Sequence, residues 1–136
     1  MPALLKPSLS IAIIRMAIGL VFMAHGAMRL IDYSLPGFGN FLDSKGFPGG
    51  FYWAWAVTIF EITGGFLMVI RRVVKIFCIG EIIILITGVI TVHFQNGWFV
   101  VGYTLGGMEY SVVLITVLIA IYIAERKEER NIRPVL

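Results

Sequence analysis

A small set of ionisable residues lies inside long apolar stretches of this chain: Arg15, His25, Arg29, Glu61, Glu81, His93 and Glu109. A charged side chain at the centre of a membrane-crossing helix costs about 2.5–3.5 kcal/mol, so such residues pair with one another or serve a function. Three carboxylates against two arginines leave one carboxylate to be protonated or to hold a histidine in its charged form. A proton-exchanging carboxyl group beside a histidine suits proton-coupled redox chemistry, although an inert hydrogen-bonded core has the same composition.

Depth along the helices separates these residues into groups. Arg15 and Glu81 both fall a few residues inside the same membrane boundary, at a rise of about 1.5 Å per residue, which predicts a structural ion pair between the first and third helices. Glu61 falls near the midplane and is the candidate for proton exchange. The remaining four are predicted in the outer half, where together with Glu61 they would bind a ligand: His25, Arg29, His93 and Glu109.

The elements that position these residues are predicted to cross a membrane. Of the 136 residues, 59% are hydrophobic and 14% are charged, and the mean hydropathy is +0.92. A soluble domain carries about 25% charged residues, and a fold this small cannot bury so much apolar surface. The composition therefore indicates a lipid bilayer as partner. It argues against a soluble enzyme, a disordered chain and a partner nucleic acid, in spite of the net charge of +3.

Four stretches reach the length of about 20 mostly apolar residues that a membrane-crossing helix needs. They cover approximately residues 8–30, 51–70, 73–94 and 106–124. Arg15 and the length of the first stretch argue against a cleaved signal peptide. The sequence therefore predicts an all-α fold, an integral membrane four-helix transmembrane bundle, with a single domain over residues 1–136.

Positive charges predict the orientation of these helices, because cytoplasmic loops carry an excess of Lys and Arg. Such residues precede the first stretch, separate the second from the third and follow the fourth: Lys6, Arg71, Arg72, Lys75, Arg126, Lys127, Arg130 and Arg133. Both termini are therefore predicted to be cytoplasmic. Aromatic residues gather at the opposite, outer interface, in agreement with this orientation: Tyr33, Phe51, Tyr52, Trp53, Trp55, Trp98, Phe99 and Tyr103.

The segments outside the apolar stretches differ in composition. Residues 31–50 are rich in Gly and Pro but also carry Phe38, Phe41, Leu42 and Phe47. This segment is predicted either to lie on the bilayer surface or to form a lid over the bundle mouth, and an ordinary amphipathic loop is an equal alternative. Residues 125–130 mix charges at helical spacing and are predicted to be a solvated helix end.

The chain offers few ligands for a metal ion or a haem. Cys78 is the one cysteine, which excludes an intrachain disulfide and a Cys-x-x-Cys redox pair. His25 and His93 are predicted at similar depth, as bis-histidine haem ligation requires, but no further haem signature accompanies them. We therefore expect no metal site and no haem, and a quinone is the cofactor that the polar interior would suit.

Four motifs carry a resemblance to a known family: Arg15-Met-Ala-Ile-Gly-Leu through Gly26-Ala-Met-Arg29, then Gly46-Phe47-Pro48, Glu61-Ile-Thr-Gly64-Gly65 and Gly106-Gly107-Met108-Glu109. On these motifs the chain resembles the DoxX family of small bacterial four-helix membrane proteins over most of its length. The Glu-x-x-Gly-Gly signature is the most specific of them. The chain departs from the family pattern at Arg71 and Arg72, where a small residue and Gly are usual, and at Glu81. Its charged C-terminal helix is a further departure.

The resemblance implies a multi-pass subunit of the bacterial cytoplasmic (inner) membrane, linked to quinone-dependent oxidation of sulfur compounds or to complexes that handle oxidative and thiol stress. Carried onto this sequence, it implies Arg15, Arg29, Glu61 and Glu109 as site residues.

Two hypotheses follow for the function. The first is a redox-associated subunit that binds a quinone-like head group and is at most part of a quinone-linked oxidoreductase. The second is a non-catalytic scaffold or assembly subunit. A transporter is disfavoured by the small size. Because the chain lacks redox-active cysteines and a cofactor motif, we expect a protein partner or a homo-oligomer.

Overall fold

The computed structural model describes residues 9–102 and 105–132, and these residues form helices and turns without a strand. Lys6, Ser8, Tyr103 and Arg133, used in the sequence predictions, lie outside the described residues. The described chain divides into two compact units, one containing residues 17–72 and the other residues 9–16 with 73–132. Helix α1 (Leu9–Ile31) runs through both. The all-α fold class is confirmed, while the single domain and the four-helix bundle stay predictions.

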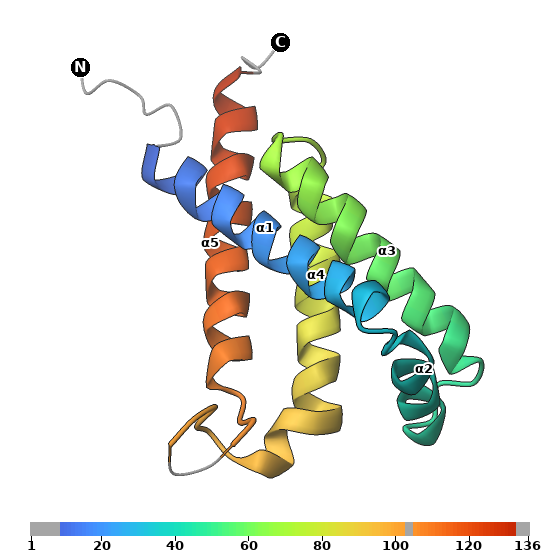
Figure 1. Cartoon of the computed structure of the whole chain (residues 1–136). Coiled ribbons are helices and arrows are strands. Elements are labelled where there is room, and N and C mark those ends of the chain that lie inside the picture. The colour runs from blue at the N-terminus through green and yellow to red at the C-terminus, as the bar shows by residue number, and fades with distance from the viewer. Residues whose placement is uncertain (1–8, 103–104, 133–136) are drawn as a thin grey trace. The chain divides into compact units, whose positions relative to one another are not determined.

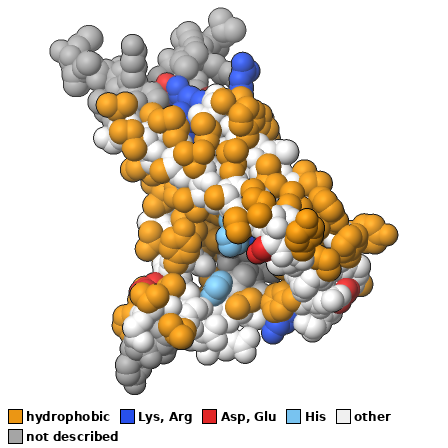
Figure 2. Space-filling view, in the orientation of Figure 1, with side chains coloured by type: hydrophobic (Ala, Val, Ile, Leu, Met, Phe, Trp, Pro, Cys, Tyr) orange, Lys and Arg blue, Asp and Glu red, His pale blue; other side chains and the backbone are white. Residues whose placement is uncertain are grey.

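Three helices are long and apolar enough to cross a membrane among the described residues: Leu9–Ile31, Gly50–Val69 and Val74–Asn96. They agree closely with the first three predicted stretches. Hydrophobic side chains cover much of the visible face in Figure 2, as contact with lipid requires. The chain is therefore a membrane protein.

The fourth predicted stretch behaves differently. Helix α5 (Glu109–Ile132) begins at Glu109, because residues 106–108 belong to the preceding turn. Its run without a charged residue, from Tyr110 to Ala124, would measure roughly 22 Å at the rise of an α-helix, which is short of the ~30 Å hydrocarbon core. Helix α5 is not among the candidate spans, so a fourth crossing stays a prediction.

In the unit of residues 17–72, glycines allow α1 and α3 (Gly50–Val69) to approach closely. A Cβ built on Gly19 would lie 2.7 Å from the carbonyl oxygen of Gly65, and one built on Gly65 would lie 2.6 Å from that of Gly19. A side chain at either position would therefore push the two helices apart. Gly65 belongs to the Glu-x-x-Gly-Gly motif, so one function of this motif is backbone contact.

The segment between α1 and α3 contains an additional helix, α2 (Leu35–Ser44), with Pro36 in its first turn. Its buried face, Leu35 and Leu42, packs with Ala54 of α3 (Figure 1). The sequence predictions for residues 31–50 described a surface segment, a lid or a loop, and they missed this helix because Gly and Pro are poor helix formers.

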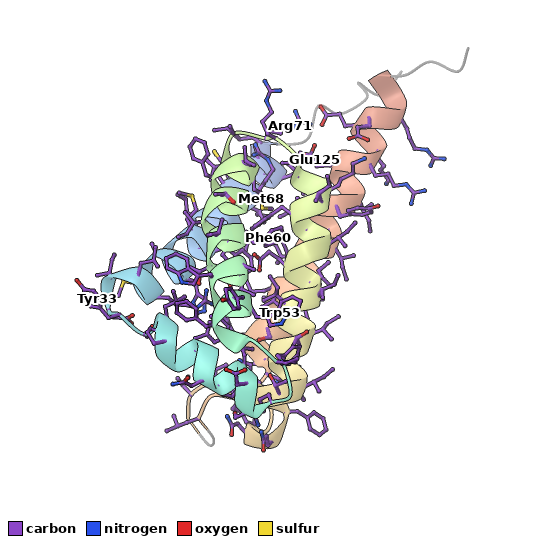
Figure 3. The ribbon with its side chains drawn as sticks, turned by 90° about the vertical axis from the view of Figure 1, so that its right-hand side faces the viewer. Tyr33, Trp53, Phe60, Met68, Arg71 and Glu125 are labelled. Atoms are coloured by element: carbon purple, nitrogen blue, oxygen red, sulfur yellow. The ribbon has the colours of Figure 1, made fainter. Side chains whose placement is uncertain are left out.

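Helix α3 ends in a Schellman motif. The N–H of Arg71 donates to the carbonyl of Met68 at 3.1 Å, and the N–H of Arg72 donates to that of Leu67 at 2.6 Å. The residue that ends such a helix is left-handed and usually Gly, but here it is Arg71, with φ of 60°. Arg71 lies at the opposite end of α3 from Trp53 (Figure 3).

In the other unit, α4 (Val74–Gly88) continues through a π-helical turn η1 (Val89–His93) and a 3-10 turn η2 (Phe94–Asn96). Helix α5 packs along α4 in the opposite direction (Figure 1). Lys75 near the start of α4 forms an ion pair with Glu129 of α5.

Val73, which precedes α4, has φ of 47°, a left-handed conformation that is unfavourable for a β-branched residue. Its side chain is 53% exposed, so little packing depends on it. We expect Val73→Gly to raise the free energy of unfolding by about 1 kcal/mol, measured by SDS titration in mixed micelles. The control Ile76→Gly, at an exposed position within α4, should lower it by about 1 kcal/mol. An equal decrease in the free energy of unfolding of both variants would contradict backbone strain at Val73.

A second prediction concerns the contact between α2 and α3. A Cβ on Gly50 would lie 2.1 Å from the carbonyl oxygen of Gly39 and 2.7 Å from the backbone nitrogen of Asp43, whereas one on Gly37 meets nothing within 4 Å. We therefore expect Gly50→Ala to lower the free energy of unfolding by about 1–3 kcal/mol. The control Gly37→Ala should leave it unchanged or raise it slightly. The same titration measures both variants. An unchanged free energy of unfolding in Gly50→Ala would show that α2 is not held in this contact.

Candidate functional site

A buried ion pair joins α1 to α3. Arg29, in the last turn of α1, donates from Nη1 to Oε2 of Glu61 and from Nη2 to Oε1 at 3.2 Å. The side chain of Arg29 is 14% exposed and that of Glu61 is 3% exposed. Two parallel N–H···O bonds between a planar guanidinium and a carboxylate make a pair that is stronger and more directional than a single contact.

Two further side chains complete the surroundings of Arg29. Nη1 also donates to the hydroxyl oxygen of Thr58 at 3.3 Å, one turn before Glu61 on α3. The ring of Phe38, from α2, lies under the guanidinium, with 4.7 Å from its centroid to Cζ. A cation over an aromatic face is attracted by the ring quadrupole, most strongly where water is excluded. Arg29 thus contacts α2 and α3 at once.

Glycine spacing on α1 explains why Arg29 reaches Glu61. Gly26 lies against α3 so closely that a Cβ there would be 3.1 Å from the carbonyl oxygen of Thr58 and 3.3 Å from Cβ of Glu61. Gly19, seven residues earlier, lies on the same face of α1. Because both positions lack a side chain, the backbone of α1 comes close to α3, and the guanidinium one turn later is within reach of the carboxylate.

In the Arg29–Glu61 pair, the guanidinium donates the hydrogen bonds and the carboxylate accepts them. A guanidinium does not lose its proton in a protein, so only the carboxylate can change its charge. The proton exchange at Glu61 and the ligand binding by Arg29 stay predictions.

His25 lies one helical turn before Arg29 on α1 and is exposed. Its imidazole makes no hydrogen bond or ion pair with any other described residue. Residues i and i+4 of a helix are neighbours on its surface, so the imidazole and the Arg29 side chain lie on adjoining parts of α1.

The other two predicted ligand residues hold a loop in the unit of α4 and α5. Nδ1 of His93 lies 2.7 Å from the carbonyl oxygen of Gly106 and must donate, since a carbonyl only accepts. The carboxylate of Glu109 accepts the backbone N–H of Val100 at 2.9 Å. His93 ends the π-helical turn η1, and such turns are rare and often lie at functional sites.

Backbone hydrogen bonds close the same loop. The N–H groups of Gly107 and Met108 donate to the carbonyls of Phe99 and Gly97, both at 3.0 Å. A Cβ on Gly107 would lie 2.5 Å from the carbonyl oxygen of Trp98, so only glycine fits there. The Gly-rich motif that precedes Glu109 therefore serves this close backbone contact.

Arg15, predicted to pair with Glu81, lies beside the carboxylate of Glu125. Nε of Arg15 lies 4.0 Å from Oε1 of Glu125, and both side chains are buried. Glu81 is fully buried on α4, and its pairing with Arg15 stays a prediction. Glu125 was expected in a solvated helix end, which is wrong for this residue, although Arg126 and Glu129 are exposed as predicted.

Of the predicted site residues, the structure brings Arg29 and Glu61 together. His93 and Glu109 belong to the other unit, where each holds the loop described above. Sequence reasoning gave no role to Thr58, although a residue three positions before Glu61 lies on the same helix face, and it missed Phe38 as a contact of Arg29. Nothing in the spacing of Phe38 indicates that contact, because it depends on how α2 packs.

No group of three or more His, Cys, Asp or Glu side chains that could hold a metal ion occurs in the part of the chain that the structure describes. Cys78 is a free, buried cysteine of α4. Asp32, in the exposed turn after α1, accepts hydrogen bonds from Ser34, which lower the pKa of its carboxyl group below the usual value.

Comparison with known proteins identifies the family. The DoxX family model matches residues 10–94, a region that includes α1, α2, α3 and α4 together with Arg29 and Glu61. The chain belongs to the DoxX family, as its motifs predicted. Comparisons with curated proteins and with solved structures gave no match. Helix α5 and Glu109 lie beyond the matched region.

The burial of the Arg29–Glu61 pair predicts an asymmetric response to mutation. We expect Glu61→Leu to lower the free energy of unfolding by about 3–5 kcal/mol, because it leaves a buried guanidinium without its counter-charge. The double variant Arg29→Met with Glu61→Leu should recover most of that loss. Thr58→Val, the control, removes one hydrogen bond and should cost about 1 kcal/mol. SDS titration measures all three, and a double variant no more stable than Glu61→Leu would contradict the pairing.

Proposed function

We propose that this DoxX protein is a redox-associated membrane subunit that binds a quinone-like head group beside the Arg29–Glu61 pair. The observation that carries the proposal is the pair itself: a buried carboxylate bound to a fixed cation, with the exposed imidazole of His25 one turn away. A structural pair alone does not account for an ionisable, exposed neighbour on an apolar helix.

The residues present fit such a head group. Its carbonyl oxygens need hydrogen-bond donors, and Arg29 and His25 can supply them. Glu61 would exchange the proton, because its carboxylate is the group whose charge can change. When bound, the quinone would supply the electron-accepting chemistry that the side chains lack. His93 and Glu109 remain candidate ligand residues in the other unit.

The proposal includes a topology. Helix α5 would be a fourth, shorter crossing, completing a four-helix bundle in the bacterial inner membrane with both termini cytoplasmic. The exposed Arg71 and Arg72 at the end of α3 and the exposed Arg126 and Lys127 of α5 support this orientation under the positive-inside rule. A partner subunit would complete electron transfer, because the single cysteine of the chain is buried and has no second cysteine with which to form a redox pair.

A non-catalytic scaffold is the second candidate. It is favoured by the mutual satisfaction of Arg29 and Glu61, which already share two hydrogen bonds. In that case the pair would only fix the packing of α1 on α3, and the protein would act by holding a partner in the membrane. A buried ion pair that specifies one arrangement of helices is a known use of such costly interactions.

Gentle purification from native membranes followed by lipid extraction and mass spectrometry tests the two candidates. We expect close to one quinone per chain in the unmodified protein. The Glu61→Gln variant should contain about tenfold less quinone, which corresponds to a loss of about 1.4 kcal/mol of binding free energy. Glu129→Gln, at an exposed position on α5, is the matched control and should retain the quinone. No quinone in the unmodified protein, together with unchanged quinone turnover in a Glu61→Gln strain, would favour the scaffold. His25→Leu provides a second test should Glu61→Gln fail to fold.

A further inference from the structure

The Arg29–Glu61 pair is covered on one side by α2. The ring of Phe38 lies 4.7 Å from Cζ of Arg29, and Phe38 is partly buried against the cluster of Leu35, Leu42 and Ala54. An aromatic ring on the face of the guanidinium blocks approach from the α2 side. The face of α2 that points away from this cluster is polar and exposed, with Asn40 and Ser44, as expected of a face in contact with water.

Helix α2 is fixed in this covering position. The carboxylate of Asp43 accepts the N–H of Gly50 at 2.9 Å, at the N-terminus of α3, where a negative charge is favourable. Gly39 lies so close to α3 that a Cβ there would be 2.9 Å from Cα of Phe51. Hydrogen bonding, backbone contact and apolar packing therefore hold α2 on α3, and displacing it would break all three.

On α1, polar and apolar side chains beside the pair are exposed. His25 is exposed on this helix, one turn from Arg29, and its exposed surroundings include Val21 and Met28. Helix α1 is a candidate membrane span, and exposed side chains of such a helix contact lipid unless another helix covers them. Among the described residues the imidazole has no hydrogen-bond partner, although an unsatisfied polar group is costly in hydrocarbon.

We propose that the ligand of this site is a lipid-soluble molecule that enters sideways from the bilayer, with a polar head group that reaches His25 and Arg29 and an apolar body that stays among the acyl chains. This inference rests on the proposed function and narrows its substrate class: it excludes water-soluble solutes that would enter past α2. The imidazole at position 25 is the first polar group that such a molecule meets.

Spin labelling in phospholipid vesicles tests the route. Two full-length variants are compared in a Cys78→Ala background: His25→Cys and Gly37→Cys. Gly37 is the matched control, because it is exposed on α2 and a Cβ there meets nothing within 4 Å. Collision of each label with molecular oxygen, which concentrates in lipid, is compared with collision with a polar nickel chelate, and circular dichroism verifies helix content.

We expect the label at position 25 to collide more with oxygen than with the chelate, and the label at position 37 to show the reverse order. Adding decylubiquinone to the vesicles should reduce oxygen collision at position 25 and leave position 37 unchanged. A label at position 25 that meets the chelate as readily as position 37 would overturn the inference, as would one shielded from both agents. Lipid exposure at position 25 in a protein that purifies without quinone would instead count against the proposed function alone.

Discussion

The ion pair between Arg29 and Glu61 is the constraint on which the unit of residues 17–72 depends. Two charges removed from water are tolerated only if each satisfies the other, and these two do so through paired hydrogen bonds. This requirement sets the distance between α1 and α3. Phe38 of α2 lies against the same guanidinium, so one cation contacts side chains of both α2 and α3.

Glycine makes this arrangement possible. Association of helices in lipid relies on close packing, because lipid tails are as apolar as the helix surfaces. Gly19 and Gly26 on α1 and Gly65 on α3 bring the backbones together. Gly39 and Gly50 do the same between α2 and α3. The Glu-x-x-Gly-Gly motif thus has two parts, a carboxylate and the backbone contact that presents it.

The second unit uses similar residue types for a different purpose. His93 and Glu109 hydrogen-bond to backbone groups of the loop between η2 and α5. Arg15 and Glu125 form a buried pair that involves α5. An ionisable residue in an apolar chain can therefore satisfy the backbone, a counter-charge or a ligand, and residue type alone does not distinguish these roles.

The sequence by itself determined the membrane class, the family and three helices to within a few residues, because apolar length and composition are local properties. It also identified Arg29 and Glu61 as residues that need partners. Tertiary structure decided that they partner each other, that Glu125 is buried beside Arg15, and that α2 is a helix with Phe38 on Arg29. These features depend on contacts between residues distant in the chain, which helical period and depth constrain but do not specify.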